Sequence, residues 1–238
     1  MDYQQGTAIT LRALRTYYPE GNFARKLHPL PDYGCIYVRN AKAATSTILF
    51  WLHLAHTGHK AWGNIHKRHK LPDAHNDVGL WRTVRMLRGQ AFRFTFVREP
   101  IRRAESAYLD KIANLKKGDQ WRARIREVLE LPPTPGEPLS FDQFVDALER
   151  QEPILMDPHW RPQHLNLMHP LLEFDLVGRL ETFDADIARV RAATGLPDLP
   201  IMTRNVSSKR PASLFDGRPD LLRRVRDVYA RDLELYGY

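Results

Sequence analysis

The chain has 238 residues, of which 43% are hydrophobic and 27% charged, and this composition gives no sign of a disordered or fibrous protein. Its length suits one domain with a sizeable buried core, so we expect a single domain over residues 1–238. The formal net charge of +8 favours anionic partners, among them nucleotides, nucleic acids, acidic glycans and membrane surfaces.

The N-terminal region carries no targeting signal that we recognise. Residues 1–21 lack the apolar stretch of about 7–15 residues that a signal peptide needs. No run approaches the roughly 18 apolar residues of a membrane-spanning helix, so we expect no transmembrane segment. The single cysteine, Cys35, cannot form an intrachain disulfide and fits a reducing compartment. We therefore expect a cytoplasmic protein.

Three short apolar or aromatic runs predict buried strands, at residues 35–38, 91–97 and 174–177. The first two runs are each followed by a polar loop and then by a helical pattern of apolar residues. The alternation predicts an α/β fold, a P-loop-like three-layer sandwich with a central parallel sheet flanked by helices. Ligands bind such sheets at the carboxyl ends of the strands, where both polar loops lie.

Further helices are predicted in the second half of the chain. Capping and breaker residues place them at residues 121–131, from Ser140 with Gln143 in a capping box, at 183–194 before Gly195, and from Pro219 to Gly237. Residues 131–138 are too rich in Pro and Gly for regular structure and are expected to link two helical segments.

The first polar loop has the residues of a phosphate cradle. Small side chains let backbone N–H groups approach an anion, and the following helix N-terminus adds partial positive charge. The cradle would consist of Lys42, Ala43, Ala44, Thr45, Ser46 and Thr47. The Walker pattern GxxxxGK[ST] is absent, because Lys42 comes four residues before Ser46. The loop is equally consistent with a plain helix N-cap at Thr45 or Ser46 beside a solvated lysine.

The second polar loop offers a phosphate clamp. Arg98 lies at the carboxyl end of the second predicted strand, and Ser106 follows eight residues later, about two turns into the next helix. An arginine fork and a hydroxyl together can hold a phosphate. The alternative is that Arg98 pairs with Glu99 or Asp110 and that Ser106 only packs.

These motifs resemble those of a known enzyme family. Residues 97–100 (VREP), followed by Arg103, residues 106–108 (SAY) and residues 110–111 (DK), resemble the 3′-phosphate-binding motif of carbohydrate sulfotransferases, above all the chondroitin and dermatan 4-O-sulfotransferase branch. The first loop resembles the family's 5′-phosphosulfate loop, with Lys42, Ser46 and Thr47 at its Lys, Thr/Ser and Ser positions. Further blocks follow in family order at residues 157–163 (DPHWRPQ), 174–182 and 205–207.

The sequence departs from the Golgi members of this family in three places. We expect no N-terminal membrane anchor in this protein, and Met168 and Leu171 stand where those members have cysteines. Thr45 occupies the small Gly or Cys position of the first loop. The first two departures suggest a compact bacterial-type relative outside the secretory pathway.

The resemblance implies a sulfuryl transfer from 3′-phosphoadenosine 5′-phosphosulfate (PAPS) to a hydroxyl of a carbohydrate or another acceptor. It implies that Lys42 neutralises charge on the leaving phosphate and that Arg98 and Ser106 hold the 3′-phosphate. No metal is expected, because positioning and charge stabilisation suffice for such a displacement.

A histidine is the natural general base at neutral pH. His66 is the first candidate and His69 the second, both in a polar, basic stretch between the two loops; His159 is a further candidate. The alternative is that this stretch is only a solvated basic loop.

Two other functions compete with a sulfotransferase. A P-loop-like kinase of a small metabolite would need a Mg²⁺-binding carboxylate, for which Asp73 or Asp77 is nearest to the first loop. A basic nucleic-acid-binding module would need basic residues on one face or a recognised motif. The basic residues are dispersed along this chain, so we expect no nucleic-acid partner. The oligomeric state is left open.

Overall fold

The computed structural model describes residues 3–18, 23–61, 65, 79–116, 118–199 and 212–238. The chain divides into two compact units. The first comprises Met1–Val97 and Asn166–Val206, and the second comprises Arg98–Leu165 and Ser207–Tyr238.

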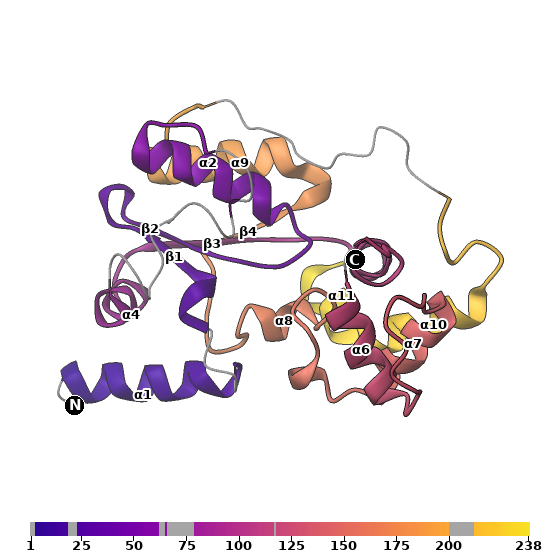
Figure 1. The fold of residues 1–238 in the computed structure, drawn as a ribbon. Helices are drawn as coiled ribbons and strands as arrows, with labels where there is room; N and C mark the ends of the chain where they lie inside the picture. Colours follow the sequence, from indigo (N-terminus) through magenta and orange to yellow (C-terminus); the bar gives the residue numbers. More distant parts are fainter. Residues whose placement is uncertain (1–2, 19–22, 62–64, 66–78, 117, 200–211) are drawn as a thin grey trace. The chain divides into compact units, whose positions relative to one another are not determined.

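A sheet of four strands forms the centre of the first unit (Figure 1). Its order is β1 (Leu27–Leu30), β2 (Cys35–Val38), β3 (Phe92–Val97) and β4 (Leu176–Arg179). The last three strands are parallel, as the sequence predicts. β1 runs antiparallel to β2, which corrects the expectation of a wholly parallel sheet. Its Pro29 hides it from sequence reasoning, but an edge strand tolerates a proline because one of its sides needs no ladder hydrogen bonds.

The strand predicted at residues 174–177 begins slightly later, at Leu176. The preceding Asp175 turns its carboxylate back to the neighbouring strand, where Oδ2 accepts from the Arg93 N–H at 2.7 Å. The same carboxylate forms an ion pair with the Arg93 guanidinium at 3.1 Å. This side-chain contact gives the Arg93 N–H a hydrogen-bond partner before the regular β4 ladder begins.

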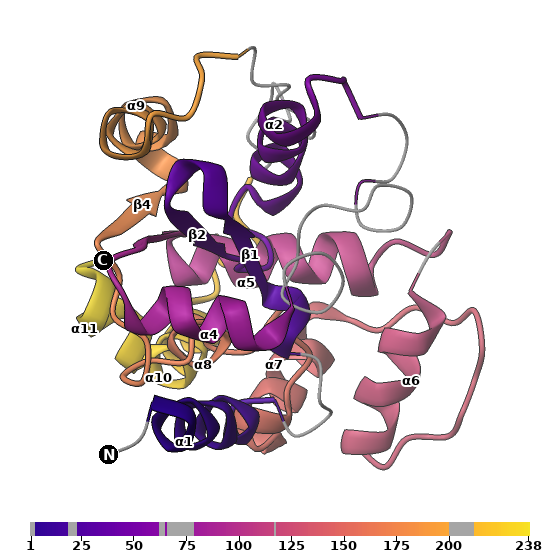
Figure 2. The same cartoon turned by 90° about the vertical axis from the view of Figure 1, so that its left-hand side faces the viewer.

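Helices cover both faces of the sheet, so the first unit has three layers (Figures 1 and 2). On one face lie α2 (Thr45–Thr57) and α9 (Phe183–Thr194), and on the other lies α4 (Leu80–Arg88). α1 (Tyr3–Thr16) packs on α4. Both ends of α9 match the sequence prediction, whereas α1 and α4 are helices that the sequence analysis did not predict.

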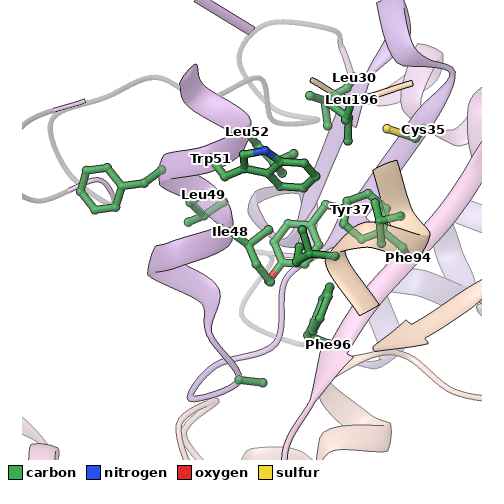
Figure 3. Close-up of a cluster of buried hydrophobic side chains, with 14 of the residues drawn as sticks. Leu30, Cys35, Tyr37, Ile48, Leu49, Trp51, Leu52, Phe94, Phe96 and Leu196 are labelled. Atoms are coloured by element: carbon green, nitrogen blue, oxygen red, sulfur yellow. The ribbon is translucent and has the colours of Figure 1, made fainter. Parts of the chain in front are cut away.

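Strand alternation explains the main core of this unit. Successive strand residues face opposite sides, so Phe94 and Phe96 of β3 and Tyr37 of β2 all point to the α2 and α9 side. Figure 3 shows α2 residues, Trp51 among them, packed over these rings. The same cluster encloses Cys35, and burial raises the pKa of its thiol to about 12, so this cysteine stays protonated and is a core residue.

The second unit is helical. Its elements are α5 (Pro100–Ala107), a π-helical turn η3 (Tyr108–Ile112), α6 (Asp119–Val128), α7 (Phe141–Arg150), the start of α8 (Gln163–Asn166), α10 (Pro219–Val228) and α11 (Ala230–Tyr236). The linker predicted at residues 131–138 is irregular and lies between α6 and α7. A short 3-10 turn, η4 (Pro153–Leu155), also lies in the second unit. Others lie in the first unit: η1 (Phe23–Lys26), η2 (Pro31–Tyr33) and η5 (Leu180–Thr182).

Local signals in this unit are largely confirmed. The Ser140 hydroxyl accepts from the Gln143 N–H at 3.1 Å, and the Gln143 side chain accepts from the Ser140 N–H at 2.9 Å, which completes the capping box. The single helix predicted from Pro219 to Gly237 is divided at Tyr229. There the backbone leaves the helical region, and the buried Tyr229 hydroxyl donates to the Trp160 carbonyl at 2.6 Å.

Within the part of the chain that the structure describes, no helix is long and apolar enough to cross a membrane.

Candidate functional site

The loop between β2 and α2 has an unusual backbone. Lys42 and Ala44 both adopt positive φ angles, 67° and 56°, in the left-handed region that disfavours residues with a Cβ atom. Each such residue costs on the order of 1–2 kcal/mol. Strain of this kind persists only where surrounding contacts hold it, and it gathers at ligand-binding loops.

Buried polar contacts hold this loop in place. Asn40 is fully buried, and its Nδ2 donates to the Phe96 carbonyl of β3 at 3.0 Å. Its Oδ1 accepts from Asn166 Nδ2 at 3.4 Å. The Thr45 hydroxyl donates to the Asn40 carbonyl and so closes the loop across its base. The loop is therefore tied to both the sheet and its own helix.

The N-cap of α2 bears on one of the two expectations for the loop. The helix N-cap is Ala44, and its side chain forms no capping hydrogen bond. The expected alternative of an N-cap at Thr45 or Ser46 is wrong, because Thr45 already lies in the first turn of α2 and its hydroxyl donates to the Asn40 carbonyl. A helix N-terminus after a turn with left-handed residues is the kind of concavity in which backbone N–H groups bind anions. Lys42, Ala43, Ser46 and Thr47 lie in this same short segment, partly or fully buried.

Arg98 directly follows the last residue of β3, as the sequence predicts. Its neighbour Glu99 caps α5, where the carboxylate accepts from the N–H groups of Ile101 at 3.1 Å and Arg102 at 2.6 Å. Asp110 forms an ion pair with Lys111 at 3.2 Å. Glu99 and Asp110, which the sequence offered as partners for Arg98, thus each have at least one other partner. Ser106 lies partly buried in the last turn of α5, directly before the π-helical turn.

His159 forms a dyad that the sequence did not reveal. Its Nδ1 lies 2.6 Å from the Asp157 carboxylate, which also accepts from the Trp121 indole N–H at 3.0 Å. Burial alone would raise the pKa of Asp157, but the hydrogen bonds and charge of His159 outweigh it and, with Trp121, lower this pKa to about 2. An ionised carboxylate at one ring nitrogen fixes the tautomer of a histidine, as in catalytic dyads.

Several predicted site residues lie outside the described residues: the two favoured bases, His66 and His69, and the carboxylates Asp73 and Asp77 of the kinase alternative. Across the residues that are described, no group of three or more His, Cys, Asp or Glu side chains is placed to hold a metal ion. Lys42 belongs to the first unit, whereas Arg98 and Ser106 belong to the second.

The sequence that contains these two loops matches a known protein family. The sequence profile described as the sulfotransferase family covers residues 16–238. The chain belongs to the sulfotransferase family. The matched region of this sulfotransferase-family chain includes both loops.

Known proteins similar to this sulfotransferase-family chain are carbohydrate sulfotransferases. Human (Homo sapiens) carbohydrate sulfotransferase 14 is 30% identical over 158 residues, covering 62% of this chain and 42% of the relative. Carbohydrate sulfotransferase 12 of Xenopus laevis is 29% identical over 170 residues (61% and 40%), and carbohydrate sulfotransferase 11 of Rattus norvegicus is 28% identical over 166 residues (61% and 46%). The match thus spans less than half the length of each relative. No solved structure shows significant similarity to the chain.

Sequence reasoning missed the residues that support the two loops. Asn40 and Asn166 hold the first loop, and Gln163 and Asp232 lie behind Arg98. Asn40 had a usable signal, because it is a polar residue placed directly after a buried strand. Gln163 stands in a block that resembles the family, but nothing local indicates its partner.

Proposed function

We propose that this protein transfers a sulfuryl group from PAPS to a hydroxyl of a carbohydrate. The observation that carries the proposal is the family match over residues 16–238, which includes both loops. The names of the similar proteins support a carbohydrate acceptor over other hydroxyl compounds. Family membership also favours this function over the metabolite kinase and the nucleic-acid-binding module.

The β2–α2 loop is proposed to hold the 5′-phosphosulfate. Its helix N-terminus suits the phosphate oxygens, with the small residues Ala43 and Ala44 allowing close backbone approach. Lys42 would stabilise the negative charge that grows on the bridging oxygen as the S–O bond to the phosphate breaks. The hydroxyls of Ser46 and Thr47 are proposed as further donors to the same group.

Arg98 and Ser106 are proposed to hold the 3′-phosphate of the donor. A guanidinium binds phosphate through two parallel N–H bonds, which fixes orientation as well as position. α5 is a well-defined support for Ser106, because Glu99 caps its N-terminus and Pro100 begins it.

The reaction is an in-line displacement at sulfur. The acceptor oxygen forms a new bond to sulfur, the bond to the 5′-phosphate oxygen breaks, and the acceptor proton passes to a base. The products are a sulfate ester and adenosine 3′,5′-bisphosphate. His66 is the first proposed base and His69 the second. His159 is the third, supported by its contact with Asp157.

A transfer assay tests this function. The protein, radiolabelled PAPS and a panel of glycans, glycolipids and phenols should give label on a glycan, and thermal stability should rise with adenosine 3′,5′-bisphosphate but not with ATP and Mg²⁺. Stabilisation by ATP and Mg²⁺ alone, without sulfate transfer, would contradict the proposal. A cytoplasmic location is likewise proposed, and fractionation of the producing cells checks it.

Single substitutions locate the base. His66→Ala should lower turnover by roughly a hundredfold with nearly unchanged PAPS affinity, because proton removal occurs only in the transition state. His69→Ala serves as the matched control. Full activity in both variants would shift the assignment to His159.

A further inference from the structure

The backbone of Arg98 forms two hydrogen bonds with the side chain of a distant residue. Gln163 Oε1 accepts from the Arg98 N–H at 3.0 Å, and Gln163 Nε2 donates to the Arg98 carbonyl at 2.8 Å. Gln163 is fully buried, with 0% of its surface exposed. One side chain therefore satisfies both backbone polar groups of the residue that follows β3.

The chemistry of this pair of hydrogen bonds is specific to an amide. A neutral amide side chain has an acceptor and a donor in one plane, so it can pair with the N–H and the C=O of a single residue. A carboxylate offers only acceptors and would repel the Arg98 carbonyl. Asparagine is one methylene shorter than glutamine, so it cannot span the same distance.

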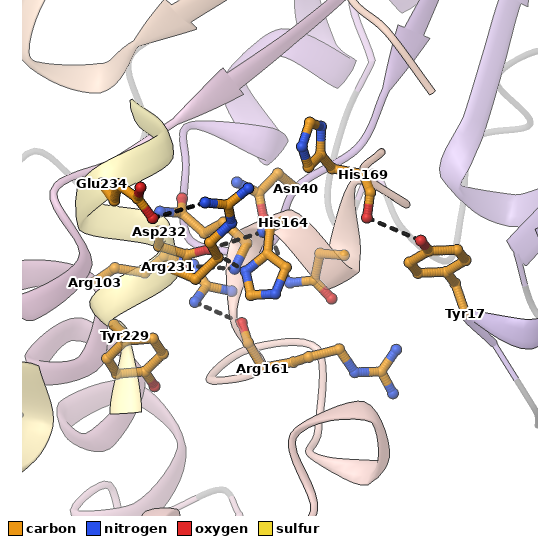
Figure 4. Close-up of polar contacts among 12 residues, drawn as sticks. Tyr17, Asn40, Arg103, Arg161, His164, His169, Tyr229, Arg231, Asp232 and Glu234 are labelled. Atoms are coloured by element: carbon orange, nitrogen blue, oxygen red, sulfur yellow. Dashed lines mark hydrogen bonds and ion pairs between the residues drawn. The ribbon is translucent and has the colours of Figure 1, made fainter. Parts of the chain in front are cut away.

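A second layer fixes Gln163 itself. The Asp232 carboxylate of α11 accepts from the Gln163 N–H at 2.5 Å and from the His164 N–H at 2.9 Å. It also lies 2.7 Å from His164 Nδ1 (Figure 4). Asp232 is fully buried, so water does not compete for these bonds. The last helix thus anchors the start of α8, from which the Gln163 side chain extends.

The segment leading to Gln163 is held as well. Arg103 of α5 is fully buried, and its guanidinium donates to the Arg161 carbonyl at 2.9 Å (Figure 4). It also donates to the Pro158 carbonyl at 2.9 Å. The Tyr229 hydroxyl donates to the Trp160 carbonyl at 2.6 Å. Because these bonds are buried and satisfied, the segment has little freedom to shift.

We propose that Gln163 is a positioning residue for the sulfuryl donor, acting through Arg98. Because Gln163 bonds to both the N–H and the carbonyl of Arg98, the backbone of Arg98 is held in place and its side chain can reach the 3′-phosphate from a fixed position. Asp232 contributes by fixing Gln163. This inference rests on the proposed function, because it needs Arg98 to bind that phosphate. Sites that bind through a positioned side chain lose affinity when the supporting residues loosen.

The test compares two ligands that differ by the 3′-phosphate alone: adenosine 3′,5′-bisphosphate and adenosine 5′-monophosphate. Their dissociation constants are measured by calorimetry on the full chain and on the Gln163→Met variant, which keeps the side-chain length but loses both hydrogen bonds. The ratio of the two constants does not depend on the folded fraction, because both ligands meet the same folded protein. Gln151→Met is the matched control, since Gln151 also donates to a carbonyl, that of Ala147 at 2.8 Å.

Gln163→Met should raise the dissociation constant of the bisphosphate about tenfold, because a misplaced contact group loses most of its effect. The dissociation constant of the monophosphate should change by less than about twofold. Asp232→Asn, a milder change, should move the ratio in the same direction. In an Arg98→Ala background, Gln163→Met should add less than about twofold, because the two residues act in one chain of contacts. Gln151→Met should leave the ratio unchanged.

Two different failures can be told apart. If the wild-type chain does not prefer the bisphosphate, the proposed function fails and this inference falls with it. If the wild type prefers the bisphosphate and Gln163→Met lowers thermal stability but keeps that preference, Gln163 is only structural and the inference alone is overturned.

Discussion

The two loops of this protein are built by different means. The β2–α2 loop is shaped within a few residues, where positive φ angles at Lys42 and Ala44 are held by the neighbouring Asn40 and Thr45. Arg98 is shaped from far along the chain, because Gln163 grips it from 65 positions away. The first loop combines this local turn with buried bonds from Asn40 to Phe96 and Asn166, whereas the Arg98 backbone is held by the side chain of a distant residue.

The largest effect is expected at the first loop. Lys42→Ala should reduce turnover about a hundredfold or more, because a preorganised charge at the leaving oxygen acts mainly in the transition state. Steady-state sulfate transfer with PAPS measures it. Lys60→Ala is the matched control, an exposed lysine after α2 that should change nothing. Equal activity of both variants would remove Lys42 from the mechanism.

The second loop should act on affinity. Arg98→Ala should weaken the binding of adenosine 3′,5′-bisphosphate by about 1.5–3 kcal/mol, the usual contribution of hydrogen bonds to a charged group. The affinity of Arg98→Lys should lie between those of the wild type and Arg98→Ala, since lysine keeps the charge but not the two parallel N–H groups of the guanidinium. Arg102→Ala, four residues further on and paired with Glu105, serves as the control in the same calorimetric titration. Unchanged affinity in Arg98→Ala would contradict the clamp.

The Asp157–His159 dyad predicts a pH dependence of stability. The pKa of Asp157 is lowered from 3.8 to about 2, so the stability it adds is present above pH 4 and is lost as pH falls toward 2. The stabilisation is about 2 kcal/mol, from the size of that shift. Melting curves of wild type and Asp157→Asn should therefore differ at pH 5 and converge near pH 2. A constant difference across this range would show that the dyad does not titrate as described.

The smallest effect tests the strain in the first loop. Ala44→Gly should raise the free energy of unfolding by about 0.5–1 kcal/mol, because glycine adopts the left-handed region without a Cβ penalty. Ala55→Gly, inside α2, should lower it by a similar amount. Denaturant unfolding of the two variants measures both. If the two changes have the same sign, the loop is not strained.

Much of the fold could be predicted from the sequence because its signals are local. Apolar runs gave β2 and β3 to within one residue, and the cap of α7 and the end of α9 followed from residue types at fixed spacing. The errors arose where local signals conflict with position in the sheet. β1 contains a proline that only an edge strand tolerates, and Asp175 delays β4 through its bond to Arg93.

The α/β class, the two polar loops at strand ends and the resemblance to carbohydrate sulfotransferases could all be read from the amino-acid sequence, because these features depend on residue types in a fixed order. The side chains that support those loops could be identified only once the chain was seen folded. Asn166 binds Asn40 across 126 positions, and Asp232 binds Gln163 across 69. Such bonds form because folding buries polar groups that must then find partners, and the partner available depends on which distant segments pack together.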